Sequence, residues 1–279
     1  MNPYTPLPDV QMLRGRQEFV LNACLGKRVL HLGCVDAGLT LERFQRGELM
    51  HQKLDKVASE LWGVDVDAEG IAFLREHGFE RLLTTDISLP EGWASQSQPD
   101  DAIQLLQAQA FDLILATEVL EHLPNPANFL AAVQRLMTPG HTQLIVTVPN
   151  AFRVDTLLWM WRNVEYVHPD HNYWFSYATI TALLRKAGFT IEQVYPYSFQ
   201  SSQVLPSKIR RLFQPARQRS NKEASVRANS ATAVPRRSVS SYFKTLPKRI
   251  LVALLYSRTP FWGDGLLVVA AVGLSLIHI

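Results

Sequence analysis

Short apolar runs alternate with segments of helical periodicity along most of the chain. The runs are rich in Val, Ile and Leu and end at Gly, Asp or Pro, which is typical of buried strands, whereas apolar residues three or four positions apart indicate one face of a helix. The predicted strands span residues 27–32, 61–66, 81–85, 110–117, 142–148, 190–197 and 265–272. The predicted helices span residues 49–59, 69–77, 126–137 and 176–187, and Asn125 and Ser176 are the expected N-caps of the last two.

This alternation predicts an α/β fold, because apolar strands joined through helices form a parallel sheet that is covered on both faces. We expect a Rossmann-like, seven-stranded, mostly parallel sheet with a basic insert before its last strand. The expected core covers residues 1–200 and 263–273, and the insert with an apolar helix covers 201–262. Residues 274–279 read LSLIHI, which resembles the translation of a sequencing adapter, so a non-native tail is expected there; a natural apolar tail is the alternative.

Positive charge is concentrated in the insert. Residues 208–249 contain twelve Lys or Arg and one acid, a net charge of +11, whereas the rest of the chain carries −8. Within it, residues 214–241 have few large apolar side chains to bury, which predicts a flexible segment. Two interpretations stay open for the insert: a solvated surface loop, or a peripheral membrane contact through residues 208–258.

The composition is that of an ordinary globular protein. With 47% hydrophobic and 19% charged residues, it excludes a wholly disordered chain, a collagen and a coiled-coil rod. Cys24 and Cys34 cannot form a disulfide scaffold and indicate a reducing compartment. The first residues lack the apolar core of a signal peptide, and no apolar run is long enough to span a membrane. We therefore expect a cytoplasmic protein, membrane-peripheral only if the insert makes that contact.

Polar or flexible residues follow four predicted strands in succession. Gly33 would let the backbone approach a ligand, and Asp65 could accept the hydroxyls of a ribose. Asp86 could accept from a purine amine, and Thr117 and Glu118 follow the fourth strand. Each residue alone is more often a helix cap or a turn residue, but four in order indicate a ligand site at the carboxyl ends of the strands.

Six segments carry a resemblance to a known family. They are VLHLGC (29–34), GVDVD (63–67), TTDI (84–87), FDLILATEVLEHLPNP (111–126), LIVTVPN (144–150) and HPDHNYWFSYATITALLRKAGF (168–189). Together they are similar to class I S-adenosylmethionine-dependent methyltransferases, in the branch that includes quinone O-methyltransferases. The resemblance covers roughly residues 10–200 and resumes at 263–272.

This resemblance implies S-adenosyl-L-methionine as the cofactor. The implied cofactor-binding residues are Gly33 and its neighbour Cys34 at the amino-acid part, Asp65 at the ribose hydroxyls, Asp86 with Ile87 at the adenine, Thr117 on the methionine side, and Val66, which follows Asp65. It also implies that Glu118 lines the substrate mouth. The first motif departs from the family pattern acid-x-Gly-x-Gly-x-Gly, because the acid is His31 and the later glycines are Val35 and Ala37.

The candidate catalytic residues are His171, Glu118 and His122. His171 lies in a segment expected to cover the strand ends and is the better candidate for a general base that removes a proton from an acceptor hydroxyl. Because a sulfonium is already an activated donor, catalysis by positioning alone is the alternative. The pair His168 and His171 has no acid at ligand spacing in the sequence, so no metal is expected.

The expected function is methyl transfer from S-adenosylmethionine, most simply to an oxygen of a small-molecule, sugar or lipid-linked acceptor. A Rossmann-type NAD(P)-binding oxidoreductase is one alternative, but residues 33–38 lack the middle glycine of G-x-G-x-x-G. A non-catalytic nucleic-acid-binding protein is the other. No recognised nucleic-acid module accompanies the basic insert, so no nucleic-acid partner is expected.

Overall fold

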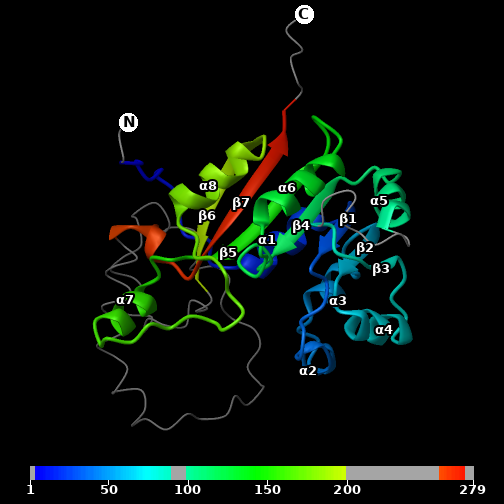
Figure 1. Ribbon diagram of the computed structural model, residues 1–279, viewed down its shortest axis with the longest axis horizontal. Coiled ribbons are helices and arrows are strands. Elements are labelled where there is room, and N and C mark those ends of the chain that lie inside the picture. The colour runs from blue at the N-terminus through cyan, green and yellow to red at the C-terminus, as the bar shows by residue number, and fades with distance from the viewer. Residues whose placement is uncertain (1–3, 89–98, 199–257, 274–279) are drawn as a thin grey trace, which may run out of the picture.

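A seven-stranded sheet forms the centre of the computed structural model, which describes residues 4–88, 99–198 and 258–273 (Figure 1). The strands are β1 (Arg28–Leu32), β2 (Glu60–Asp65), β3 (Leu82–Thr84), β4 (Leu113–Thr117), β5 (Gln143–Pro149), β6 (Phe189–Tyr197) and β7 (Gly265–Val272). Their order is β3-β2-β1-β4-β5-β7-β6, and only β7 runs antiparallel to its neighbours. The predicted fold class and all seven strands are confirmed.

Eight α-helices accompany the sheet in the described part of the chain. They are α1 (Arg16–Cys24), α2 (Thr40–Gln45), α3 (Met50–Leu54), α4 (Ala68–Glu76), α5 (Pro99–Gln107), α6 (Pro126–Arg135), α7 (Val154–Met160) and α8 (Tyr177–Lys186). The predicted helix over 49–59 is shorter than expected, since α3 ends at Leu54. Sequence periodicity did not predict α1, α2, α5 or α7, which are short helices of six to nine residues and offer few repeats of an apolar stripe.

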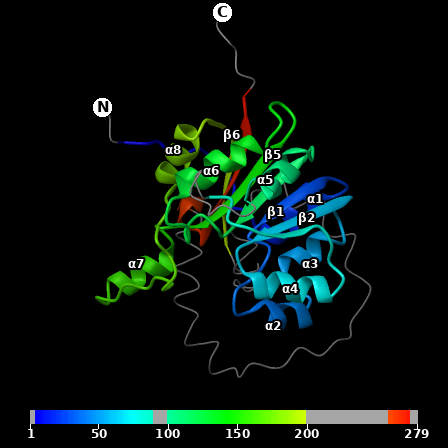
Figure 2. The ribbon, with the colours of Figure 1, turned by 45° about the vertical axis from the view of Figure 1, so that its right-hand side comes forward.

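Alternate residues of the strands pack in two separate layers of the core, one on each face of the sheet. Leu30 and Leu32 of β1 pack in the cluster that contains residues of α5, α6 and α8, whereas Val29 packs in the cluster that contains residues of α1 and α3. Figures 1 and 2 show α6 and α8 on one side of the sheet. Because successive strand side chains point to opposite faces, both faces of the sheet are apolar and buried.

Two predicted caps fix the helices that flank the candidate site. The Asn125 side chain accepts hydrogen bonds from the N–H groups of Ala127 and Asn128 at the start of α6. Ser176 and Thr179 form a capping box at the start of α8. Each cap satisfies backbone donors that the first helical turn leaves without partners, so the turns before α6 and α8 have defined ends.

The segment that precedes β7 packs into the core. Phe261 is buried in a short 3-10 helix over Pro260–Trp262. The Asn150 side-chain amide at the end of β5 donates to the carbonyls of Phe261 (2.7 Å) and Gly263 (2.9 Å), which ties the two segments together. Most of the basic insert and the expected non-native tail lie outside the described residues. Among the helices that are described, none is long and apolar enough to cross a membrane.

A buried histidine pair lies beneath the loop that follows β1. His31 of β1 and His51 of α3 are each 1% exposed, and their Nδ1 atoms are 3.2 Å apart, so one ring donates and the other accepts. Gly63 on β2 leaves the space they need, because a Cβ there would lie 2.8 Å from His51 Cε1. Burial lowers the pKa of both rings, that of His51 to about 4. The pair is therefore neutral at pH 7.

We expect this pair to make the fold acid-sensitive. As the pH falls below about 6.5, the unfolded chain protonates these histidines before the folded chain does, so stability that is complete above that pH is lost toward pH 4. His51 alone should cost about 2 kcal/mol of unfolding free energy between pH 7.5 and pH 5. Urea unfolding at the two pH values measures this, with the double variant His31→Leu, His51→Leu as the control. An equal loss in the control would contradict the assignment.

Candidate active site

The candidate site lies where the strand order reverses. β1 pairs with β2 on one side and β4 on the other, so the chain leaves the sheet in opposite directions at their carboxyl ends. Leu32 is level with Val64 and with Ala116, which places the residues that follow these three strands along one edge. Ligands of open α/β sheets bind at this switch point. The structure thus brings the predicted strand-end residues together.

Gly33 is required by its surroundings. Its φ is +71°, in the left-handed region, and a Cβ would lie 2.5 Å from Cγ2 of Val119, which follows β4. Its N–H donates to the Val64 carbonyl at 2.9 Å. The residue therefore has a packing role of its own, and the absence of a side chain lets the β1 turn lie directly against the segment after β4.

Asp65 accepts two backbone hydrogen bonds and keeps capacity for more. Its Oδ2 accepts from the Val35 N–H (2.9 Å) and its Oδ1 from the Asp67 N–H (3.0 Å). Burial raises the pKa of Asp65, while the backbone donors oppose that rise. Because a carboxylate offers about four acceptor positions, both oxygens can still accept from ribose hydroxyls. Asp67 instead caps α4 through the N–H groups of Glu69 and Gly70.

The second glycine of the family motif is replaced without crowding the turn. Val35 stands in its place and belongs to the layer that α4 covers. A Cβ on Gly70 in the first turn of α4 would overlap Cγ1 of Val35. The valine side chain thus occupies the space that Gly70 leaves free, and its N–H remains available to Asp65.

The four remaining predicted cofactor residues on this side divide into two groups. Val66 is 66% exposed and Asp86 is exposed, and Asp86 Oδ1 accepts from the Ser88 N–H and hydroxyl at 2.8 and 2.6 Å. Cys34 and Ile87 are buried, 1% and 4% exposed, with their side chains in the apolar core. The side chains of Cys34 and Ile87 thus belong to the core, and contact of these two residues with the cofactor stays a prediction.

Glu118 joins three separate elements at the end of β4, directly after Thr117. Its Oε1 accepts from Thr147 Oγ1 of β5 (2.8 Å) and from the Tyr197 hydroxyl of β6 (2.6 Å). The same oxygen lies 3.0 Å from Arg16 Nη1 of α1. Tyr197 is fully buried, and its pKa is raised well above the usual value by that burial and by Glu118. Sequence patterns gave no signal for Arg16 or Tyr197, which are distant along the chain.

A pocket of about 340 Å³ opens beside Glu118. Its lining comes from the ends of β4 and β5, from α7 and from the segment before α8: Glu118, Pro149, Asn150, Ala151, Arg153, Thr156, Tyr166, Val167, His168, Pro169, His171, Tyr173 and Trp174. Three aromatic residues of the segment around His171, namely Tyr166, Tyr173 and Trp174, thus line a cavity. That volume lies within the range of small-molecule sites.

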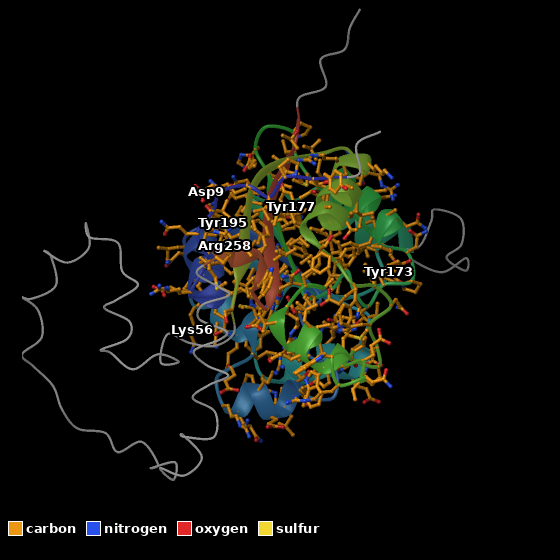
Figure 3. The ribbon with its side chains drawn as sticks, turned by 90° about the vertical axis from the view of Figure 1, so that its left-hand side faces the viewer. Asp9, Lys56, Tyr173, Tyr177, Tyr195 and Arg258 are labelled. Atoms are coloured by element: carbon orange, nitrogen blue, oxygen red, sulfur yellow. The ribbon has the colours of Figure 1, made fainter. Side chains whose placement is uncertain are left out.

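Hydrogen bonds hold the His171 segment against the turn after β4. The Asn172 N–H donates to the Glu121 carbonyl, and the Asn172 side chain donates to the His122 carbonyl, both at 2.7 Å. The hydroxyl of Tyr173, labelled in Figure 3, donates to the Pro124 carbonyl at 3.0 Å. These bonds place the His171 ring 4.7 Å from the His122 ring.

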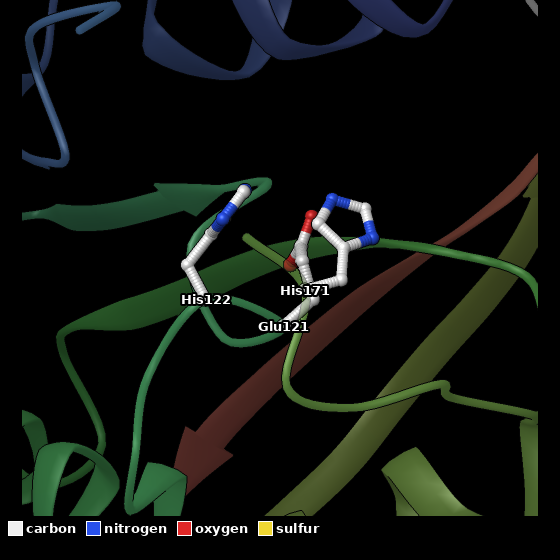
Figure 4. A group of neighbouring side chains, drawn as sticks. All are labelled: Glu121, His122 and His171. Carbon is white, nitrogen blue, oxygen red and sulfur yellow. The ribbon is translucent and has the colours of Figure 1, made fainter. Parts of the chain in front are cut away.

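Glu121 is a site residue that the sequence did not single out. It is 1% exposed, and neither carboxylate oxygen has a hydrogen-bond partner among the described residues. Burial, followed by the charge of Glu118, raises the pKa of Glu121 to about 8. Figure 4 shows Glu121, His122 and His171 together, and their ligand-type atoms lie within 4.8 Å of one another. The fold thus places an acid, Glu121, beside His171, although the two are distant in the sequence. A carboxylate and two imidazoles in this arrangement can hold a divalent cation or a proton.

His171 is suited to accept a proton at neutral pH. Burial, His122 and His168 lower its pKa, in that order of importance. Its ring lies 5.1 Å from that of His168. The predicted residues His171, His122 and Glu118 are thus brought to one region, although only His171 and Glu118 line the pocket.

Comparison with known proteins assigns the family. A family model described as "Methyltransferase domain" matches residues 9–194. A ubiquinone biosynthesis O-methyltransferase of Nitrosococcus oceani is 28% identical over 139 residues, 49% of this chain and 50% of that protein. Its counterpart in Xanthomonas oryzae pv. oryzae is 27% identical over 179 residues, 61% and 65% of the two chains. The chain thus matches half to just under two thirds of the length of these relatives.

One solved structure supports the fold alone. The small RNA methyltransferase HEN1 aligns with a TM-score of 0.50 and 14% identity, over 99% of this chain and 28% of that one. At this identity the likeness concerns the sheet and its helices and not the substrate.

We expect Gly33→Ala to destabilise the protein by about 1–3 kcal/mol, because it adds both left-handed strain and a contact with Val119. Gly38→Ala is the matched control: its φ is +74°, but a Cβ there meets nothing within 4 Å. Urea unfolding should show the larger loss at Gly33, and Val119→Ala should reduce it. Equal losses at Gly33 and Gly38 would contradict the packing role.

Proposed function

The chain belongs to the methyltransferase-domain family, and from this premise we propose that it transfers a methyl group from S-adenosyl-L-methionine to an acceptor oxygen. The observation that carries the proposal is that two features lie next to each other. They are the strand ends with Gly33 and Asp65 at the switch point, and the histidine-lined pocket beside Glu118. A methyl donor on the first and an acceptor in the second would meet at the end of β4. The comparisons support neither the oxidoreductase nor the nucleic-acid-binding alternative.

The residues at the switch point suit the cofactor. Both oxygens of Asp65 can accept further hydrogen bonds, and the turn at Gly33 packs against the segment after β4, which brings the two strand ends of the site together. Exposed Val66 offers an apolar surface beside them, and Asp86 an acceptor. We assign ribose binding to Asp65, adenine contact to Val66 and Asp86, and the methionine side to Gly33 and Thr117. When bound, S-adenosylmethionine supplies an activated methyl group on a positively charged sulfur.

His171 is the proposed general base. The acceptor hydroxyl would lie in the pocket within reach of the imidazole, which is neutral at pH 7 and takes the proton as the oxygen acquires the methyl group. Glu118 and His122 shape the surroundings of this histidine. His171 would hold the acceptor's proton while the methyl group leaves the sulfur for the oxygen, which leaves S-adenosylhomocysteine as the second product. The pocket would orient the acceptor for this transfer.

The proposed acceptor is a small molecule with a ring. The cavity is bounded by Tyr166, Tyr173 and Trp174, which offer flat apolar surfaces. The relatives are named for O-methylation in ubiquinone biosynthesis, which favours a phenolic acceptor over a sugar or a lipid-linked one. The proposed cytoplasmic location and peripheral membrane contact rest on the composition of the chain and the charge of residues 208–258, nearly all of which lie outside the described residues.

Calorimetry with S-adenosylhomocysteine, NAD and an RNA oligomer separates the three candidate functions. We expect binding of S-adenosylhomocysteine only. Binding of NAD alone would favour the oxidoreductase, and binding of RNA alone the nucleic-acid-binding protein.

We expect Asp65→Ala to weaken binding of S-adenosylhomocysteine at least tenfold, since it removes charge-assisted bonds worth about 1.5–3 kcal/mol. Asp67→Ala is the matched control, because it removes the α4 cap and lowers stability while leaving ligand affinity unchanged. Titration calorimetry on folded variants measures both. Weakened binding in Asp67→Ala with normal binding in Asp65→Ala would reverse the assignment.

We expect His171→Ala to lower turnover roughly 10²–10⁴-fold while binding of S-adenosylhomocysteine is unchanged. Release of S-adenosylhomocysteine with a panel of phenolic acceptors provides the assay. Since the base must be neutral and burial lowers the pKa of His171, the wild-type rate should fall only at a pH more acidic than the ordinary histidine pKa. His171→Gln keeps a hydrogen bond but cannot take the proton, so near-normal turnover in that variant would leave positioning as the mechanism.

A chelator distinguishes a base from a metal ligand at the same residues. With His171 as the base, EDTA should leave the rate unchanged. Loss of activity that Zn²⁺ or Mg²⁺ restores would instead assign Glu121, His122 and His171 to a cation.

A further inference from the structure

Glu118 is held in a backbone conformation that non-glycine residues avoid. Its φ is +55°, and its N–H donates to the Thr147 carbonyl at 2.9 Å. Strain of this kind persists only where the surroundings determine the conformation, and it is found at functional sites. The side-chain contacts of Glu118 are therefore the place to look for the cause.

One oxygen of this carboxylate is saturated and the other is not. Oε1 forms an ion pair with Arg16 (3.0 Å) and accepts hydrogen bonds from the hydroxyls of Thr147 (2.8 Å) and Tyr197 (2.6 Å). Among the described residues, Oε2 accepts no hydrogen bond, and the side chain is 27% exposed at the wall of the pocket. The arrangement fixes the carboxylate through one oxygen and leaves the second for a ligand.

Arg16 supplies the positive charge in this group. Its guanidinium lies 5.2 Å from the centre of the Tyr197 ring, with Nη1 3.3 Å from Thr147 Oγ1. Two acids, Glu118 and Glu121, interact with this one cation. Without Arg16, the Glu118 carboxylate would lose its ion-pair partner and would be held only by the two hydroxyl donors.

Glu118 also lies at the boundary between the two halves of the site. The next residue, Val119, contacts Gly33 on the proposed cofactor side, whereas Glu118 lines the acceptor pocket. A methyl group that passes between the two must cross this boundary. A fixed carboxylate oxygen there would favour a ligand that carries positive charge at the crossing point.

We propose that Arg16 is a positioning residue that, together with Thr147 and Tyr197, fixes the Glu118 carboxylate so that its second oxygen faces the sulfonium of the methyl donor. The inference rests on the proposed function. It predicts that the protein distinguishes S-adenosylmethionine, whose sulfur is charged, from S-adenosylhomocysteine, whose sulfur is neutral, and that Arg16 sets this preference.

The test is the ratio of the two dissociation constants, measured by calorimetry on the full chain without an acceptor. Arg16→Met should lower the preference for the charged ligand about tenfold, because a charge-assisted contact is lost. Arg16→Lys should keep most of the preference, and Tyr197→Phe should lower it less than Arg16→Met does, since it removes a donor and no charge. Arg28→Met, which breaks the 3.1 Å Arg28–Glu60 ion pair away from this pocket, is the matched control and should leave the ratio unchanged.

The outcomes separate this proposal from the one it rests on. If both ligands weaken equally in Arg16→Met, Arg16 is only structural and the positioning role is overturned, while the proposed function stands. If the wild-type protein binds neither ligand, both proposals fail. Should Arg16→Met not fold, Arg16→Lys and Tyr197→Phe decide, and an unchanged ratio in both would overturn the positioning role.

Discussion

One carboxylate oxygen joins the elements around the pocket. Oε1 of Glu118 interacts with Arg16 of α1, Thr147 of β5 and Tyr197 of β6, which are far apart along the chain. Hydrogen bonds to a charged acceptor in a largely buried place are strong, and each member left without its partner would be costly. The left-handed backbone at Glu118 is sustained by this network, so the pocket wall, the end of β4 and the first helix depend on one another.

At the carboxyl ends of β1 and β2, close packing holds the turns together. Gly33 admits Val119, and Gly70 admits Val35, so two absent Cβ atoms let the turns after β1 and β4 and the start of α4 come together. This explains how the first motif can lose its second glycine and keep a usable turn. The valine that replaces that glycine lies toward α4, and Asp65 still receives its N–H.

Next to the pocket, a buried carboxyl lies beside a histidine. Glu121 is enclosed without a hydrogen-bond partner among the described residues, beside another acid, and its pKa therefore rises to about 8. The segment around Asn172 closes over it and brings His171 close to His122. A histidine with a lowered pKa and a carboxyl with a raised one then stand side by side, which is the pattern expected where protons are exchanged at neutral pH.

Local patterns in the sequence were enough to predict the strands, the capped helices α6 and α8, and the strand-end residues Gly33, Asp65 and Glu118, because apolar periodicity, caps and turns are local properties. Contacts between residues that are far apart in the sequence, and the burial that results from them, became visible only in the folded protein. Arg16 reaches Glu118 across 102 positions of the chain, Glu121 becomes the acid beside His171, and Cys34 and Ile87 turn into the core. Short helices such as α1 and α7 also escaped prediction, since their stability comes from packing against the fold and not from their own periodicity.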